Sequence, residues 1–259
     1  MVRLIAFCEA AADFRTASGL LDRVLREEGP SWIADLIDEQ SDSVRTWYLD
    51  SRGRAFFDVH TWREYAKQLS IRIPHGHFGG RPGGAGALMA RTVFLIAREL
   101  NRRANEGEQI EVVMLVWDMD DQPADRRGGL AVARDEARSW ATFEIVLGCP
   151  DPMRETWVLA GFDPVHDDER TCFEDIRREL GFSPIEQAHR LTAKDEQAKL
   201  SAKRVLRALV DGDPDREERC WRETPLEILR DRGASSGLRE YLDAIRQLVL
   251  PRCARAPLR

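Results

Sequence analysis

Short apolar runs alternate with amphipathic stretches along the first 160 residues of the chain. Three runs have the length and apolar character of strands buried on both faces of a parallel sheet: residues 2–8, 112–116 and 143–147. Apolar positions spaced three and four apart predict helices from Asp13 to Gly29 and over residues 87–103 and 125–140. This alternation predicts an α/β fold with a central, mainly parallel sheet flanked by helices.

Beyond residue 160 the pattern contains helices only. The helix-forming stretches are residues 166–190, 194–210, 225–229 and 237–249, and residues 194–210 have the pattern of one continuous helix. We therefore expect a core at residues 1–160 and a helical C-terminal region at residues 161–259. Residues 31–86 interrupt the core pattern with aromatic side chains and a glycine-rich turn, so they form either short strands or an insertion.

Composition and charge narrow the classes of function. A hydrophobic fraction of 43% is enough for a folded core, whereas a formal net charge of −6 excludes an extended basic surface, so nucleic acid would need a local patch. The five cysteines are odd in number and contain no CxxC pair, which indicates reduced thiols. The chain has no secretion signal and no apolar run of about 20 residues, so we expect a soluble, cytoplasmic protein without a membrane contact.

Carboxylates follow each of the three predicted strands. Asp118 and Asp120 come after the 112–116 run and, because side chains alternate along a strand, would point the same way. Two like charges this close repel each other unless a cation or a proton lies between them. The remaining members of the set are Glu9 and Asp13 after the first strand and Glu155 after the third. Ligands bind at the C-terminal edge of a parallel sheet, and carboxylate oxygens suit Mg²⁺ or Mn²⁺. These five carboxylates therefore predict a metal site. The alternative for residues 118–121 is a solvated turn.

Two of these motifs resemble those of a known family. Phe7-Cys8-Glu9-Ala10-Ala11-Ala12-Asp13 and Val116-Trp117-Asp118-Met119-Asp120-Asp121 are similar to the strand–Glu and strand–Asp-x-Asp motifs of the Toprim domain of topoisomerases, primases and overcoming-lysogenization-defect nucleases. A third segment, residues 152–159, resembles the Glu-x-Trp-Leu segment of small Toprim-like proteins. The similarity covers about residues 2–160 and implies a Toprim, Rossmann-like sheet. It departs from the family at Ala10, where the nuclease branch has glycine.

The resemblance implies a nuclease, since the chain lacks a tyrosine-nucleophile domain and a primase zinc motif. Such an enzyme cleaves DNA or RNA phosphodiester bonds with Mg²⁺ or Mn²⁺. Glu9 would be a ligand or general acid/base, Asp118 and Asp120 metal ligands, and Lys203 the group that neutralises the scissile phosphate. The small relatives are often linked to an ATPase partner in phage defence, so we expect such a partner and leave a homo-oligomer open.

Two other functions stay open. Ala10 favours a catalytically inactive, Toprim-derived regulatory or assembly module. A small-molecule phosphohydrolase would need a threonine or serine motif soon after its aspartate, and the sequence DMDDQPADR contains none.

Basic and aromatic side chains supply candidate contacts to nucleic acid. Arg81 lies in the glycine-rich loop 79–86, and Arg127 and Arg134 share one face of the 125–140 helix, where they could bind phosphates beside the ion. The alternatives are an ordinary surface loop and a solvated helix face. The aromatic residues between positions 47 and 62 could stack on bases or pack an insertion or a partner surface.

Overall fold

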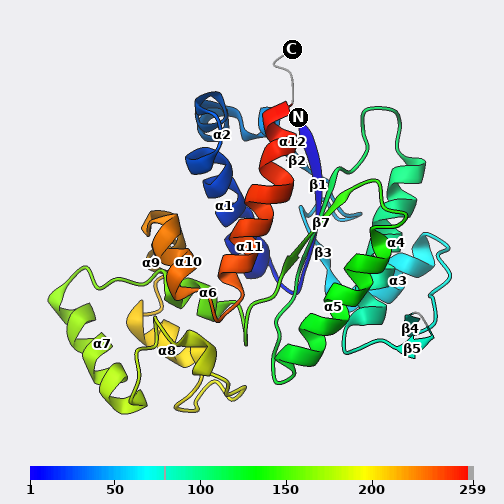
Figure 1. Ribbon diagram of the computed structural model, residues 1–259. Coiled ribbons are helices and arrows are strands. Elements are labelled where there is room, and N and C mark those ends of the chain that lie inside the picture. Colours follow the sequence, from blue (N-terminus) through cyan, green and yellow to red (C-terminus); the bar gives the residue numbers. More distant parts are fainter. Residues whose placement is uncertain (79, 256–259) are drawn as a thin grey trace. The chain divides into compact units, whose positions relative to one another are not determined.

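Five parallel strands form the central sheet of the computed structural model, which describes residues 1–78 and 80–255, the side chain of Arg81 excepted (Figure 1). The strands are β1 (Val2–Cys8), β2 (Arg45–Trp47), β3 (Phe57–Asp58), β6 (Val112–Val116) and β7 (Glu144–Gly148). β2 and β3 pair with β1 on one side, β6 pairs with β1 on the other, and β7 pairs with β6. This arrangement confirms the predicted α/β fold with a mainly parallel sheet.

The apolar runs form these strands because both faces of the sheet are covered. Every residue of β6 is buried, and so is every residue of β1 except Arg3. The helices of this part of the chain are α1 (Ala11–Glu28), α2 (Ser31–Val44), α3 (Trp62–Gln68), α4 (Ala87–Arg103) and α5 (Pro123–Ala137). α1 lies on one side of the strands with α12 (Leu250–Arg255), and α4 and α5 lie on the other (Figure 1). The remaining elements are the short helix η1 (Val59–Thr61) and the hairpin of β4 (His77–Phe78) and β5 (Arg81–Pro82).

The described chain forms two compact units. Unit 1 consists of Met1–Trp117, Gln122–Gly148 and the chain from Asp243 onward, and unit 2 of Asp118–Asp121 and Cys149–Leu242. The helices of unit 2 are α6 (Glu155–Ala160), α7 (Asp167–Leu180), η2 (Ala188–Arg190), α8 (Ala202–Leu209), α9 (Pro214–Glu223) and α10 (Leu226–Arg232). The chain passes from α11 (Leu238–Ala244) through the π-helix η3 (Ile245–Val249) into α12. The predicted C-terminal helices are therefore present, and the division near residue 160 stays a prediction.

Unit 2 has its own interior. Trp157 is almost completely buried, its indole nitrogen donates to the carbonyl of Ser236 over 2.8 Å, and its ring stacks on Tyr241 with centroids 4.8 Å apart. A buried aromatic with its polar atom satisfied is a strong anchor for a small helical core. No helix in the described part of the chain is both long enough and apolar enough to cross a bilayer.

Two predicted helices differ from the structure. The 166–190 stretch is helical only over α7 and η2, because Gly181 ends α7 with a φ of 80°. The helix predicted over residues 194–210 is wrong over half its length. Residues 194–201 are not helical, and α8 begins only at Ala202, after Ser201 accepts a hydrogen bond from the backbone N–H of Arg204 over 3.3 Å. Serine is a favoured residue at this capping position. The stretch before Ser201 is mostly charged or polar and offers no apolar face to bury, whereas α8 buries one. α9 went unpredicted, although Asp213 caps it and Pro214 begins it.

Candidate functional site

The sheet of unit 1 has a topological switch point between β1 and β6. β1 connects through α1 and α2 to β2 on one side, and β6 connects through α5 to β7 on the other. The register pairs Phe7 of β1 with Leu115 of β6, so the two strands end at the same edge, where Glu9 and Trp117 follow. Open α/β sheets bind ligands at such a point, outside the carboxyl ends of the strands.

Glu9 and Asp13 form the acidic end of β1. The carboxylate of Asp13 accepts a hydrogen bond from the backbone N–H of Ala10 over 2.8 Å, which starts α1. Burial raises the pKa of the Cys8 thiol well above its ordinary value, and the nearby charges of Asp13 and Glu9 raise it further. The thiol is therefore neutral, and the two predicted carboxylates lie close to it in unit 1.

The glycine-rich loop of unit 1 is held by the protein's own groups. Gly86 has a φ of +78°, and a Cβ there would lie 2.3 Å from the Trp117 ring, so glycine is required at this position. The backbone N–H of Ala85 donates to the carboxylate of Asp125 over 3.1 Å. The loop therefore leads into α4 and is tied to α5, because the carboxylate of Asp125 accepts a hydrogen bond from one of the loop's backbone amides.

Asp118 and Asp120 lie beyond the end of β6, and Asp120 begins a turn. β6 ends at Val116, and beyond it Met119 and Asp120 donate their backbone N–H groups to the carbonyls of Pro150 and Pro152, each over 2.9 Å. The prolines have no N–H, so the ladder between β6 and β7 cannot continue past Gly148. Asp120 has a φ of 50°. The expectation that strand alternation sets the directions of Asp118 and Asp120 is therefore wrong.

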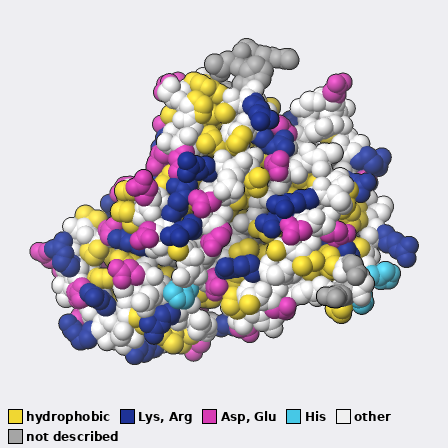
Figure 2. All heavy atoms as spheres, in the orientation of Figure 1, with side chains coloured by type: hydrophobic (Ala, Val, Ile, Leu, Met, Phe, Trp, Pro, Cys, Tyr) yellow, Lys and Arg dark blue, Asp and Glu magenta, His cyan; other side chains and the backbone are white. Residues whose placement is uncertain are grey.

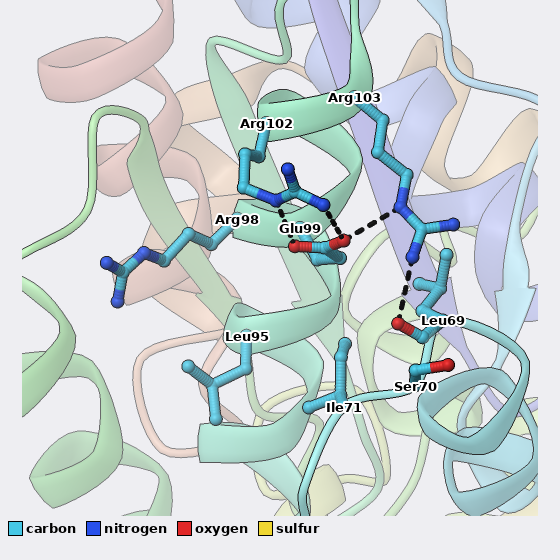
Figure 3. Close-up of a pocket in the computed structure, with 8 residues that line it drawn as sticks. All are labelled: Leu69, Ser70, Ile71, Leu95, Arg98, Glu99, Arg102 and Arg103. Atoms are coloured by element: carbon cyan, nitrogen blue, oxygen red, sulfur yellow. Dashed lines mark hydrogen bonds and ion pairs between the residues drawn. The ribbon is translucent and has the colours of Figure 1, made fainter.

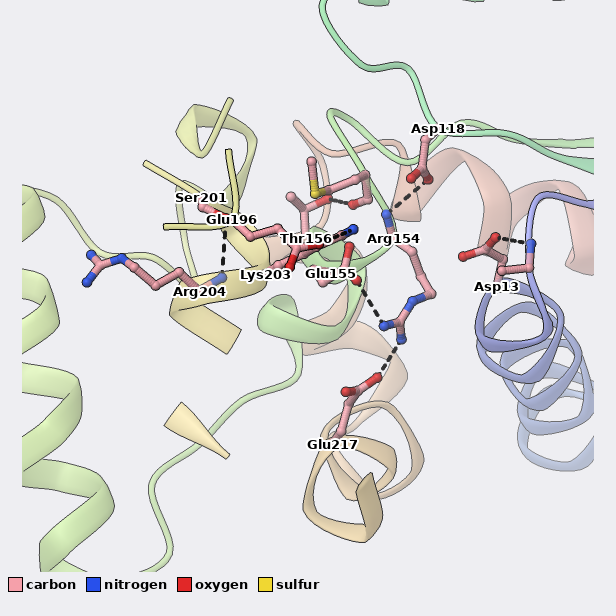
Figure 4. A network of polar contacts seen from close by, with 12 residues as sticks. Asp13, Asp118, Arg154, Glu155, Thr156, Glu196, Ser201, Lys203, Arg204 and Glu217 are labelled. Carbon is pink, nitrogen blue, oxygen red and sulfur yellow. Dashed lines mark hydrogen bonds and ion pairs between the residues drawn. The ribbon is translucent and has the colours of Figure 1, made fainter. Parts of the chain in front are cut away.

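Arg154 is the centre of a charged network in unit 2 (Figure 4). Its backbone N–H donates to Asp118 over 3.1 Å, and its guanidinium donates to Glu155 over 3.1 Å and to Glu217 over 2.6 Å. The residue is only 8% exposed, and a buried guanidinium requires such partners because it has left water. Sequence reasoning missed this residue, since nothing separates Arg154 from other arginines before the fold is known.

Lys203 shares the electrostatic environment of two predicted metal ligands. Its ammonium contacts the Glu196 carboxylate over 3.0 Å. This hydrogen bond raises the pKa of Lys203, burial lowers it, and the charges of Glu155 and Asp118 raise it further, with a net increase. A second lysine, Lys194, contacts Asp121 over 3.2 Å. Unit 2 therefore combines carboxylates with lysine side chains, as a site for a phosphate ester would.

The carboxylates of unit 2 have the oxygen chemistry that a magnesium ion prefers, but the described part of the structure does not gather three of them at one place. Among residues 1–78 and 80–255, no three carboxylate, imidazole or thiolate groups lie together as ligands of one ion. Mg²⁺ is commonly held by one or two carboxylates, with water and substrate phosphate completing its shell. The roles of Asp118 and Asp120 as metal ligands stay a prediction, and so does the five-ligand set of Glu9, Asp13, Asp118, Asp120 and Glu155.

The predicted nucleic-acid contacts lie on α5 and in β5. Arg134 on α5 contacts its neighbour Asp135 over 3.1 Å, and Arg127 on the same helix is half-buried. The side chain of Arg81 lies outside the described residues. Lysine and arginine side chains are interspersed with aspartate and glutamate on the face shown in Figure 2, in keeping with the net charge of −6. The role of these arginines stays a prediction.

Comparison of the chain with models of protein families, with curated proteins and with solved structures finds no match in any of the three. The resemblance to Toprim domains therefore stays a prediction carried by the motifs alone.

Proposed function

We propose that this chain is a nuclease of Toprim type that hydrolyses phosphodiester bonds with Mg²⁺ or Mn²⁺. The observation that carries the proposal is that Lys203, Glu155 and Asp118 belong to one network of polar contacts in unit 2 (Figure 4). The hydrogen bond to Glu196 is the main cause of the raised pKa of Lys203, and the charges of Glu155 and Asp118 add to it. Support also comes from unit 1, where Glu9 follows β1 at the topological switch point of the sheet.

Each residue has a distinct role in this proposal. Lys203 is protonated at neutral pH, so its ammonium can contact a non-bridging phosphate oxygen and stabilise the charge that develops during cleavage. Arg154 is a positioning residue, because it donates to Asp118 and Glu155. Asp118 and Asp120 would hold the metal ion, which supplies positive charge beside the phosphate. Glu9 is the general acid/base that the motif implies.

Cleavage assays test this proposal. We expect the protein to cut plasmid, single-stranded DNA or tRNA in Mg²⁺ or Mn²⁺. Lys203→Gln should reduce the rate by about 10²-fold, because it removes a positive charge from the transition state. Asp118→Asn and Glu9→Gln should reduce cleavage at least as much. Lys199→Gln is the matched control, since Lys199 is an exposed lysine in the segment before α8 and has no role in the proposal.

The control and the wild-type protein should cut at the same rate. Equal cleavage by the Lys203→Gln and Lys199→Gln variants would contradict the role of Lys203. Circular dichroism and thermal unfolding of each variant separate a loss of activity from a loss of folding.

An ATPase partner belongs to the same proposal. A net charge of −6 disfavours tight binding of long duplex by this chain alone, so a partner would supply or present the substrate. Phage defence is the setting that the motif resemblance implies. The partner is tested by identifying the neighbouring reading frame and, where it encodes an ATPase, by assaying cleavage with and without that ATPase. A neighbour that is not an ATPase, or a rate that the ATPase leaves unchanged, argues against the partner.

A non-catalytic regulatory or assembly module is the second candidate. It is favoured by the contacts of Asp118 and Glu155 with Arg154 and by Ala10 at the position of the family's glycine. Titration calorimetry with Mg²⁺ and Mn²⁺ separates the two functions. The regulatory module is selected if the protein does not bind these ions and does not cleave nucleic acid, with or without the partner.

A further inference from the structure

Unit 1 has two adjoining surface pockets of different chemistry. One, of about 250 Å³, is lined by aromatic and apolar side chains that include Tyr48, Leu49, Phe57 and Tyr65. The other, of about 580 Å³, is lined by arginines of α4 together with Leu95 and Ile71 (Figure 3). Leu69, at the end of α3, lines both pockets. A single ligand that crosses Leu69 would therefore meet an apolar pocket and a cationic one.

The aromatic pocket has fixed walls and an open side. The rings of Phe57 and Tyr65 lie 4.9 Å apart between centroids, edge to face, and those of Tyr48 and Phe57 lie 6.2 Å apart. Leu49 is 54% exposed at this pocket, so a flat ring that covered it would remove apolar surface from water. Stacking on aromatic side chains is sequence-tolerant recognition of nucleobases.

Asp50 orders the loop of residues 50–54, part of which lines this pocket. Burial raises the pKa of its carboxyl, but hydrogen bonds from Arg54 and from the backbone of Arg52 prevail and lower it. The carboxylate is therefore ionised and bound to groups of its own loop. The pocket wall that follows β2 is built before any ligand arrives.

The cationic pocket presents guanidinium groups that are already oriented. Glu99 accepts two hydrogen bonds from Arg102 and one from Arg103, each of 2.7 Å, and Arg103 also donates to the Leu69 carbonyl over 2.9 Å. The hydrogen bonds from Arg102 and Arg103 lower the pKa of Glu99 to about 2. Arg98 also lines the pocket, although its guanidinium lies over the Trp140 ring, so the lining has three positive charges and one negative charge, an excess of two. The fork of a guanidinium matches phosphate oxygens in geometry, and the Arg102 side chain is 70% exposed.

We propose that unit 1 binds a nucleoside di- or triphosphate across Leu69, with the base in the aromatic pocket and the phosphates on the arginines of α4. A flat apolar ring joined to a polyanion fits the two chemistries together, whereas free phosphate would use only the second pocket. One phosphate group carries nearly two negative charges at pH 7, enough to balance this excess, and three guanidinium groups offer contacts to more than one phosphate. None of these residues belongs to the nuclease site proposed above, so either proposal can fail without the other.

Titration calorimetry on the full chain tests the site. ATP and GTP are the probes, with adenosine and pyrophosphate as the two halves of the ligand, and EDTA keeps the assay independent of the ion proposed for cleavage. We expect ATP or GTP to bind more tightly than either half. Arg102→Gln and Leu49→Asp should each weaken binding by about tenfold, since each removes one of the two recognition elements.

Matched controls come from unit 2. Arg170 forms an exposed pair three residues from its partner Asp167, as Arg102 does with Glu99, and Val165 is 58% exposed. Arg170→Gln and Val165→Asp should leave nucleotide affinity unchanged.

Three outcomes would overturn the proposal. The first is no binding of ATP or GTP at millimolar concentration. The second is pyrophosphate bound as tightly as ATP with no effect of Leu49→Asp, which would reduce the site to a phosphate contact. The third is an equal loss of affinity in the control variants.

Discussion

Two clusters of arginine and glutamate, one in each unit, place the same residue types in opposite surroundings. In unit 1, Arg102 and Arg103 share Glu99, and their side chains are 70% and 46% exposed. In unit 2, Arg154 is shared by Glu155 and Glu217, and its side chain is 9% exposed. The first cluster has an excess of arginine and the second an excess of glutamate.

Burial decides what each cluster can do. An exposed ion pair contributes little to stability because water solvates its members equally well when they are apart. Its guanidinium groups remain within reach of an anion from solution. A buried pair has lost that solvation, so removal of one partner leaves an uncompensated charge. We therefore expect the arginines of unit 1 to matter for binding and Arg154 to matter first for folding.

The largest effect is expected from Arg154→Ala. This change leaves Glu155 and Glu217 without their shared cation and should lower the free energy of unfolding by about 3 kcal/mol, the low end of the range for buried pairs because Glu217 is 30% exposed. Urea denaturation followed by circular dichroism measures the change. A decrease in the free energy of unfolding of less than about 1 kcal/mol would mean that the buried cluster contributes no more to stability than the exposed one.

A smaller effect is expected from acid on a second buried pair of unit 2. The hydrogen bond from Arg216 lowers the pKa of Glu169 below its ordinary 4.5, against burial. The folded state therefore binds this proton less tightly than the unfolded state, so the stabilisation is complete above pH 4.5 and is lost as pH falls through the lowered pKa. We expect the stability of the wild-type protein to fall more steeply below pH 4.5 than that of Arg216→Gln. Urea titrations at several pH values measure the stability of both proteins. If the stability of the two proteins falls in parallel with pH, Arg216 is not the cause of the acid sensitivity.

The smallest effect on stability is expected from Arg102→Gln. Its ion pair with Glu99 is exposed, and Arg103 still contacts the same carboxylate. The melting temperature should stay within the error of measurement while nucleotide affinity falls about tenfold. A clear drop in the melting temperature would show that this cluster also supports the fold.

The central sheet could be predicted because its signal is local. β1 and β6 are short apolar runs, and α4 repeats apolar residues at helical spacing, so each carries its own evidence of burial. The prediction of a helix over residues 194–210 was wrong for its first half, because that stretch is mostly charged or polar and has no apolar face to bury. The predicted carboxylates were found from their positions after strands, without any knowledge of their partners.

The partners of the charged groups depend on the tertiary structure. Arg154 and Glu217 are separated by 63 residues along the chain, and the arginines of α4 meet Leu69 only because α3 and α4 pack together. Sequence alone determined the α/β architecture, because burial leaves an apolar run in β1, β6 and β7 and a helical period in α1 and α4. Only the tertiary structure decided which arginine is buried with Asp118 and which faces solvent beside an aromatic pocket, because the energy of a charge depends on its surroundings rather than on its neighbours in sequence.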